Sequence, residues 1–274
     1  MTRSDTAHRT RPGPDGPAPR VKLFGAFRSG TNYVKALLEL NYRVKVVGNE
    51  GGFKHAPVPA MFEGGRFRPF PLPIVLVTKA PYPWLVSMWR YVSGPGACHA
   101  RSGASWEAFL TEPLVVSDGS HPGFPEYRFA NPVEYWNAIN ANVLSLPHRA
   151  RAVARYESLI EAPGDAVAAI ADRFGLQTGP GAFRPVVNRT RNMVDRPRAE
   201  IEDYVHEDVF DVDFYRDHRY RPAFTDEQAT WVRTRLDAAV CDALGYLRTL
   251  PPSTRLDQRH PASHHQPPRP VPIR

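Results

Sequence analysis

The feature that most constrains the fold is a glycine-containing turn that lies between a short apolar strand and a helix near the start of the chain. Residues 21–24 read Val-Lys-Leu-Phe, which predicts a buried strand. Apolar positions recur on a helical period from Val34 to Leu38, which predicts a helix directly after the turn. Such a helix presents unpaired backbone N–H groups at the positive end of its dipole, and both features favour an anion. The turn, residues 25–30, is therefore predicted to bind phosphate.

The expected donors in this turn are backbone amides and one cationic side chain. The amides are those of Ser29, Gly30, Thr31 and Asn32, and the guanidinium of Arg28 adds forked donors. The turn resembles half of the Walker A motif, Gly-x-x-x-x-Gly-Lys-Ser/Thr. However, Thr31 stands at the lysine position and Asn32 at the magnesium-holding position. These two residues argue against a nucleoside-triphosphate hydrolase or kinase and favour a phosphate that needs no metal.

Strands and helices alternate along the rest of the chain. Further strands are expected at residues 44–47, 74–78 and 152–156. Helices are expected near residues 83–91, 132–144, 167–174 and 232–247. The uninterrupted run at 74–78, rich in β-branched residues, is typical of a strand buried on both faces of a parallel sheet. This order predicts an α/β fold, a three-layer sandwich with a mostly parallel central sheet.

One domain is expected at residues 21–250, with a tail at each end. The chain has 274 residues, and 42% of them are hydrophobic, which is enough for a sizeable core. Residues 1–20 and 251–274 are rich in proline and poor in apolar side chains, so they are predicted to be disordered. Residues 93–128 contain frequent glycine and proline and a single helix-like piece at 106–110. A long loop of this kind is usually functional.

Composition narrows the classes of partner and compartment. The formal net charge of +7 suits an anionic ligand. A nucleic-acid partner is disfavoured, because the tails carry much of this charge and aromatic residues do not interleave with the basic ones. Cys98 and Cys241 are far apart and form no Cys-x-x-Cys pair, which argues against a zinc site and a disulfide framework. Neither a signal peptide nor a membrane span is visible, so a cytoplasmic protein is expected.

A second basic group follows the strand at residues 74–78. Lys79 comes directly after the strand, and Ser87 lies eight positions later on the expected helix. A cation and a hydroxyl that converge from a strand end and the next helix suit a second phosphate.

Together the two segments resemble the sulfotransferase superfamily that uses 3′-phosphoadenosine-5′-phosphosulfate (PAPS). The resemblance covers about residues 21–247, and it implies a P-loop NTPase-like sulfotransferase fold. It implies that the segment from Arg28 to Tyr33 binds the 5′-phosphosulfate, and that Lys79 and Ser87 bind the 3′-phosphate. The product would be adenosine 3′,5′-bisphosphate, and no metal would be needed.

The resemblance also suggests further ligand-binding and catalytic residues. Tyr33 is expected to stack on the adenine, and Tyr156, in a Tyr-Glu-x-Leu segment, to lie near it. Arg189 and Arg191 form a late basic segment that resembles the one closing over the 3′-phosphate. A poor match leaves a solvated basic loop as the alternative.

The expected general base is His55, in Phe53-Lys54-His55-Ala56-Pro57, because many members carry a catalytic histidine at this place. Glu50 is the alternative base. Arg28 and Lys54 are the candidates that stabilise the sulfuryl group and the leaving oxygen.

The residues leave the acceptor and two other functions open. The loop at 93–128 is expected to shape the acceptor site, for a saccharide or a small metabolite with a hydroxyl or amine. One alternative is a P-loop kinase or phosphotransferase, which would need magnesium and a replacement for the missing lysine. Another is a sulfotransferase relative that binds the nucleotide without turnover.

Overall fold

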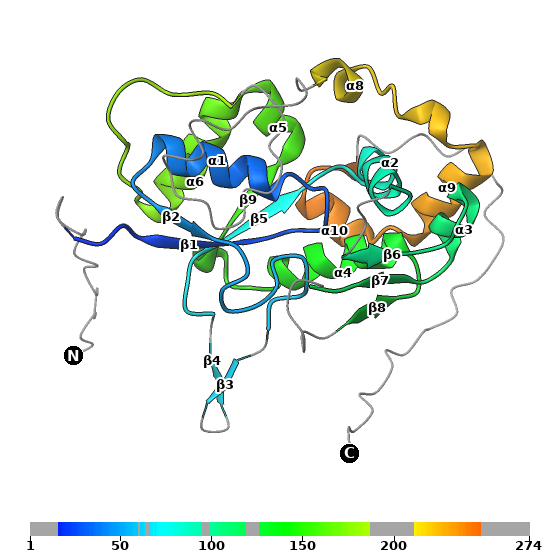
Figure 1. Cartoon of the computed structure of the whole chain (residues 1–274), viewed down its shortest axis with the longest axis horizontal. Coiled ribbons are helices and arrows are strands. Elements are labelled where there is room, and N and C mark those ends of the chain that lie inside the picture. The colour runs from blue at the N-terminus through cyan, green and yellow to red at the C-terminus, as the bar shows by residue number, and fades with distance from the viewer. Residues whose placement is uncertain are drawn as a thin grey trace, which may run out of the picture.

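A four-stranded parallel sheet forms the centre of the fold (Figure 1). The computed structural model of the chain describes residues 16–59, 61–63, 66–68, 70–94, 99–118, 126–186 and 211–247. The strands lie in the order β2-β1-β5-β9. Their bounds are Lys45–Val47, Arg20–Phe24, Ile74–Thr78 and Arg151–Arg155, respectively. All three pairings between neighbours are parallel, which confirms the predicted mostly parallel sheet.

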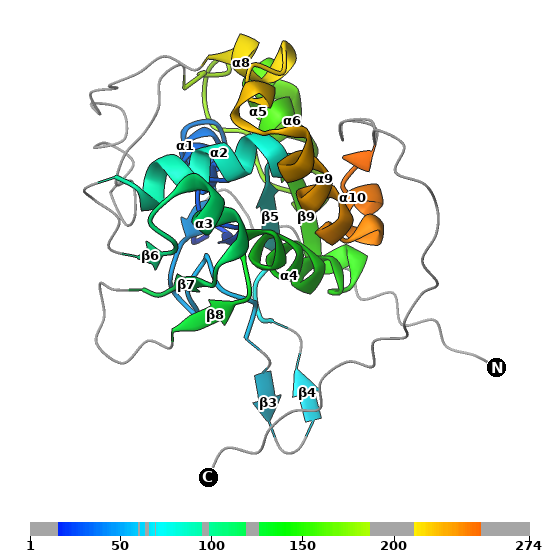
Figure 2. The ribbon, with the colours of Figure 1, turned by 90° about the vertical axis from the view of Figure 1, so that its right-hand side faces the viewer.

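Helices cover both faces of this sheet, because alternate residues of the central strands pack into two different cores (Figures 1 and 2). Val75 and Val77 of β5 pack with α1 (Thr31–Asn41) and α6 (Pro163–Phe174). Ile74 and Leu76 of the same strand pack with the opposite helices. These are α2 (Pro81–Val92), α4 (Pro132–Leu144), α9 (Asp226–Arg235) and α10 (Ala238–Ala243). The sheet is therefore the middle layer between two layers of helices.

The segment expected to be an irregular loop contains regular structure. Three short strands, β6 (Ala100–Arg101), β7 (Leu114–Val116) and β8 (Tyr127–Phe129), form an antiparallel sheet. The helix α3 (Trp106–Thr111) lies between the first two strands in the chain and contains the expected helical piece. All three residues of β7 are buried, so this apolar run supplies part of the core. The frequent glycines and prolines around it hid this strand in the sequence pattern. Residues 95–98 and 119–125 of this segment lie outside the described ranges.

The single helix expected at residues 232–247 is wrong, because the chain breaks between α9 and α10. Leu236 has an extended backbone, with ψ at 133°. The side chain of Asp237 then accepts the N–H groups of Ala239 and Val240 and starts a new helix. The apolar period in the sequence continues across this break, but the aspartate side chain bonds to the backbone and favours the start of a second helix over continuation of the first.

Other elements complete the described chain. A short antiparallel hairpin, β3 (Met61–Glu63) and β4 (Arg66–Arg68), projects from the body (Figure 1). The 3-10 helices span His148–Ala150 and Arg221–Ala223. Two further helices follow β9 in the chain, α5 (Tyr156–Glu161) and α8 (Val212–Arg216), and they lie side by side (Figures 1 and 2). α2 begins at Pro81, two residues before its expected start. Proline is tolerated there because the N–H groups in the first turn of a helix have no partner within the helix.

The ends of the domain are only partly described. The carbonyl of Pro19 accepts the N–H of Lys45, and that of Gly16 accepts from Arg43, so residues 16–20 pack beside β2 rather than joining the predicted tail. Residues 1–15 and the tail predicted at 251–274 lie outside the described ranges. No helix in the described part of the chain is both long and apolar enough to cross a lipid bilayer.

Candidate functional site

The turn between β1 and α1 has a backbone that only glycine accommodates at two positions. Gly25 lies so close to β5 that a Cβ atom there would be 2.3 Å from the Val77 carbonyl oxygen. Gly30, which precedes the first turn of α1, has a φ of 100°. A Cβ atom on Gly30 would be 2.6 Å from the Tyr156 ring. The turn is therefore packed tightly against both β5 and the start of α5.

The polar groups of the turn differ in what they offer a ligand. The Ser29 N–H donates to the Ala26 carbonyl at 3.2 Å, so this amide is used inside the turn and is not one of the expected ligand donors. The Ser29 hydroxyl is buried and has no hydrogen-bond partner in the described structure. α1 begins without a side-chain cap and has no acidic residue in its first turn. Arg28, at a φ of 65°, is exposed beside the start of this helix.

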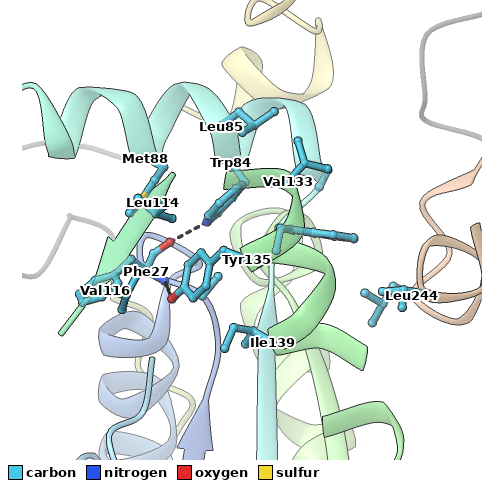
Figure 3. Packing of buried hydrophobic residues seen from close by; sticks show 14 of the residues in the cluster. Phe27, Trp84, Leu85, Met88, Leu114, Val116, Val133, Tyr135, Ile139 and Leu244 are labelled. Carbon is cyan, nitrogen blue, oxygen red and sulfur yellow. Dashed lines mark hydrogen bonds between the residues drawn. The ribbon is translucent and has the colours of Figure 1, made fainter. Parts of the chain in front are cut away.

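Two buried aromatic side chains fix the backbone of Phe27 (Figure 3). The Phe27 N–H donates to the Tyr135 hydroxyl at 3.0 Å. The Phe27 carbonyl accepts from the Trp84 indole N–H at 2.6 Å. The Tyr135 hydroxyl itself donates to the His55 carbonyl at 2.9 Å. α2 and α4 thus brace the turn, and one hydroxyl ties it to the segment that contains His55.

His55 is held as a neutral base with a defined tautomer. Its Nδ1 lies 2.7 Å from the Gly25 carbonyl oxygen. A carbonyl can only accept, so Nδ1 carries the proton and Nε2 carries the lone pair. Burial lowers the pKa of His55 well below its ordinary value of 6.5, and the charge of Lys54 lowers it further. The imidazole stacks on Phe27 with ring centroids 4.0 Å apart. The imidazole is therefore uncharged at neutral pH, with an unprotonated Nε2.

Lys54 joins this base to the start of α1. Its ammonium donates to the Asn32 side-chain oxygen at 2.8 Å. Its carbonyl accepts the Gly25 N–H at 3.0 Å. The two bonds bring the buried Lys54 charge to the first turn of α1, beside the turn that contains Arg28.

The second basic group assembles at the end of β5. The ammonium of Lys79 donates to the Ser87 hydroxyl at 3.3 Å, so the pair predicted from their spacing is in contact. It also donates to the Tyr215 hydroxyl at 3.2 Å and lies 4.0 Å from the centroid of the Tyr156 ring. Lys79 is only 4% exposed, and this burial lowers its pKa. The charge of Arg28 lowers it further, which indicates that both cations act on one region.

A carboxylate, Glu157, ties together the segments at this end of the sheet. Glu157 accepts the Ala80 N–H at 2.9 Å and the Tyr246 hydroxyl at 3.0 Å. These bonds tie the residue after Lys79 to the segment after α10. The hydrogen bond with Tyr215 and, after it, the charge of Glu157 raise the pKa of Lys79 and so oppose the effect of burial.

One predicted site residue, Tyr33, does not join these groups. Tyr33 is buried in the core between the sheet and α1, and its hydroxyl donates to the Leu159 carbonyl at 3.2 Å. Burial raises the pKa of Tyr33 to about 12. The structure therefore gives Tyr33 a core position instead of a position that faces a ligand. Arg189 and Arg191 lie outside the described residues.

Glu50, the alternative base, is directed elsewhere. Its carboxylate pairs with Arg20 at the first residue of β1, whereas His55 contacts the residue that follows the other end of this strand. The Glu50 side chain is 57% exposed, and its hydrogen bond with Arg20 lowers its pKa. A surface carboxylate with a lowered pKa and a cationic partner is a poor proton acceptor.

Four residues of the site escaped the sequence reasoning: Trp84, Tyr135, Tyr215 and Lys22. Lys22 is fully buried, and its ammonium donates to the carbonyls of Gly48, Glu50 and Gly52 in the loop that leads to His55. A lysine within an apolar strand was the one available signal for Lys22. No signal in the sequence pointed to Trp84, Tyr135 and Tyr215, because the residues to which they bond are far away in the chain.

No family model, curated protein or solved structure matches the chain. The features that bear on function are the two basic groups after the neighbouring strands β1 and β5 and the neutral imidazole of His55.

Proposed function

We propose that the protein is a sulfotransferase with a P-loop NTPase-like fold, which transfers the sulfuryl group of PAPS to an acceptor. The acceptor would be a saccharide or a small metabolite with a hydroxyl or amine. The observation that carries the proposal is the contact between Lys79 and Ser87 at the end of β5, beside the strand that leads into the turn at residues 25–30. Two anion-binding groups at neighbouring strand ends suit a nucleotide with separate 5′- and 3′-phosphates.

The donors of the turn support the 5′-phosphosulfate part of this assignment. The start of α1 is open to an anion, because neither a side-chain cap nor an acidic residue occupies it. The buried Ser29 hydroxyl is a donor that a phosphate oxygen would satisfy. Arg28 lies in the turn before this helix and Lys54 contacts Asn32 in its first turn, so both cations would balance the negative charge.

The proposed reaction is an in-line displacement at sulfur. His55 Nε2 takes the proton of the acceptor hydroxyl as the acceptor oxygen forms a bond to sulfur. The bond between sulfur and the bridging 5′-phosphate oxygen breaks, and its electron pair leaves with adenosine 3′,5′-bisphosphate. Lys54 and Arg28 stabilise the charge that develops on this oxygen. The proton on the imidazolium then passes to solvent, so the products are the sulfated acceptor, the bisphosphate and one proton.

Binding of adenosine 3′,5′-bisphosphate without magnesium tests the proposal. The bisphosphate is expected to raise the melting temperature of the protein, since a ligand that binds only the folded state stabilises it. Lys79→Ala should remove most of this shift. Lys45→Ala removes the same charge from an exposed position on β2 and should preserve the shift.

The result that would overturn the assignment is a wild-type protein that the bisphosphate does not stabilise. Stabilisation by ATP that requires magnesium would favour the kinase alternative. If the bisphosphate binds, a panel of acceptors with labelled PAPS then separates an enzyme from a relative that binds the nucleotide without turnover. His55→Gln should abolish transfer while leaving bisphosphate binding in place.

A further inference from the structure

We propose that Tyr215 on α8 is a specificity-determining residue of the second anion site, where its hydroxyl bonds a nucleotide 3′-phosphate together with Lys79 and Ser87. This inference rests on the proposed function and extends it to a residue that lies 136 positions beyond Lys79 in the chain. No motif in the sequence pointed to this tyrosine.

The geometry around the Lys79 ammonium carries the inference. The Tyr215 hydroxyl lies 3.2 Å from Lys79 Nζ, and the Ser87 hydroxyl lies 3.3 Å from the same atom. Both hydroxyl oxygens accept from the ammonium, and each hydroxyl keeps its own hydrogen to donate. An anion that approaches Lys79 is therefore within reach of one cation and two hydroxyl donors from three different elements.

Aromatic faces shape the same site. The ammonium lies 4.0 Å from the Tyr156 ring centroid and 5.3 Å from that of Tyr215. The two rings are 5.2 Å apart and inclined by 59°. Ring faces carry partial negative charge and stabilise the buried cation without neutralising it. The two rings therefore leave the Lys79 ammonium as a cation that an anion can approach. The packing of the Tyr215 ring against Tyr156 also orients the Tyr215 hydroxyl.

α8 holds Tyr215 in place although the helix is short. It packs against α5, which begins at Tyr156 (Figure 2). The neighbouring Phe214 ring lies 5.6 Å from the Arg90 guanidinium of α2. The Asp211 side chain accepts the Phe214 N–H at 3.0 Å and caps the helix. Contacts to both α5 and α2 therefore position Tyr215 across the group formed by Lys79 and Ser87.

The expected consequence is discrimination between nucleotides with and without a 3′-phosphate. A 3′-phosphate dianion gains a charge-assisted hydrogen bond from the tyrosine hydroxyl, whereas a nucleotide that lacks the 3′-phosphate has no phosphate oxygen at this site to accept it. Tyr215→Phe keeps the ring and its contact with Lys79 but removes the hydroxyl. Losing one hydrogen bond to a charged group corresponds to about a tenfold loss of affinity or more. The loss should fall on the bisphosphate alone.

Calorimetric titration of the full chain tests this inference with two probes, adenosine 3′,5′-bisphosphate and adenosine 5′-monophosphate. Tyr215→Phe should lower the ratio of the two affinities by about tenfold through the bisphosphate, with the monophosphate unchanged. Tyr220→Phe is the matched control, because it removes a tyrosine hydroxyl in the same segment, one that bonds to His218 at 2.8 Å. The control should keep the wild-type ratio. Both affinities in a ratio are measured on the same protein preparation, so a misfolded fraction affects both titrations equally and cancels in the ratio.

The outcomes separate the two proposals. If the wild type prefers the bisphosphate and Tyr215→Phe keeps this preference, the role of Tyr215 is wrong and the proposed function stands. An equal loss for both probes would also overturn it, because it would make Tyr215 a structural residue. If the wild type does not bind the bisphosphate, the proposed function and the inference are both wrong.

Discussion

Removing the hydroxyl of Tyr135 should cost much more stability than removing a typical buried tyrosine hydroxyl. This one group accepts the Phe27 N–H at 3.0 Å and donates to the His55 carbonyl at 2.9 Å. It therefore joins the turn before α1 to the segment of the expected base. Tyr135→Phe keeps the ring in the core and leaves both backbone groups buried without this partner.

The magnitude follows from the two groups left behind. A buried donor or acceptor that loses its partner costs about 1–3 kcal/mol, so two of them should lower the free energy of unfolding by about 2–6 kcal/mol. Tyr82→Phe is the control, since its hydroxyl donates to the Ala229 carbonyl at 2.8 Å and its loss should cost about 1 kcal/mol. Urea unfolding measures both differences, provided that the slope of the transition is unchanged.

A cost for Tyr135→Phe no larger than that for Tyr82→Phe would refute this reasoning. It would mean that Phe27 and His55 find other partners or that water reaches them. If the reasoning holds, the variant should also bind adenosine 3′,5′-bisphosphate more weakly at a temperature where it is fully folded, because the turn has lost one of its two braces.

Three further changes test other parts of the site. Gly30→Ala should destabilise the protein and abolish bisphosphate binding, because the new Cβ would lie 2.6 Å from Tyr156 at a φ of 100°; a normal melting curve with retained binding would contradict the tight packing of the turn. Glu50→Gln should leave the transfer rate within about twofold, since the carboxylate pairs with Arg20 on the surface, whereas a fall of about a hundredfold or more would restore Glu50 as the base. Stability should also depend on pH through His55, because the pKa of this residue is depressed in the folded state. Below about pH 6.5 the unfolded chain therefore binds more protons than the folded chain. The free energy of unfolding should fall as the pH decreases in that window, by up to about 1.4 kcal/mol per pH unit. Urea unfolding of the wild type and His55→Gln between about pH 5 and pH 7 should show a shallower dependence in the variant, and equal slopes would show that His55 is not held neutral.

The parallel sheet and the turn were predictable from the sequence because their signals are local. The buried run at β5 predicts its own strand, and the glycines at 25 and 30 mark the turn without reference to the rest of the chain. The pairing of Lys79 with Ser87 was predicted from the spacing of the sulfotransferase motif that the sequence resembles, and the local geometry permits it. A residue at a strand end and one eight positions later can face each other when the helix starts directly after the strand.

The contacts that complete the site depend on tertiary packing, which the local pattern does not encode. Tyr135 is 108 positions from Phe27, and its place on a helical stripe identifies a core residue but not its hydrogen-bond partner. Tyr33 illustrates the reverse case. It stands within the motif at residues 28–33, yet its side chain turns into the core toward Leu159.

Three buried lysines show how partners separate a structural cation from an anion-binding one. Lys22 donates to three backbone carbonyls, which match its three N–H donors and can only accept. Such partners satisfy the ammonium permanently and make it a fixed support for the loop at residues 48–52. Lys54 donates to an amide oxygen at the helix start, where a phosphate oxygen would be a stronger acceptor. Lys79 donates to two hydroxyls that can themselves donate, so the same group can bind an anion by reorienting two O–H bonds without moving its heavy atoms. All three are lysines near strands in the sequence, and only the chemistry of their acceptors distinguishes the support from the two candidate binding groups.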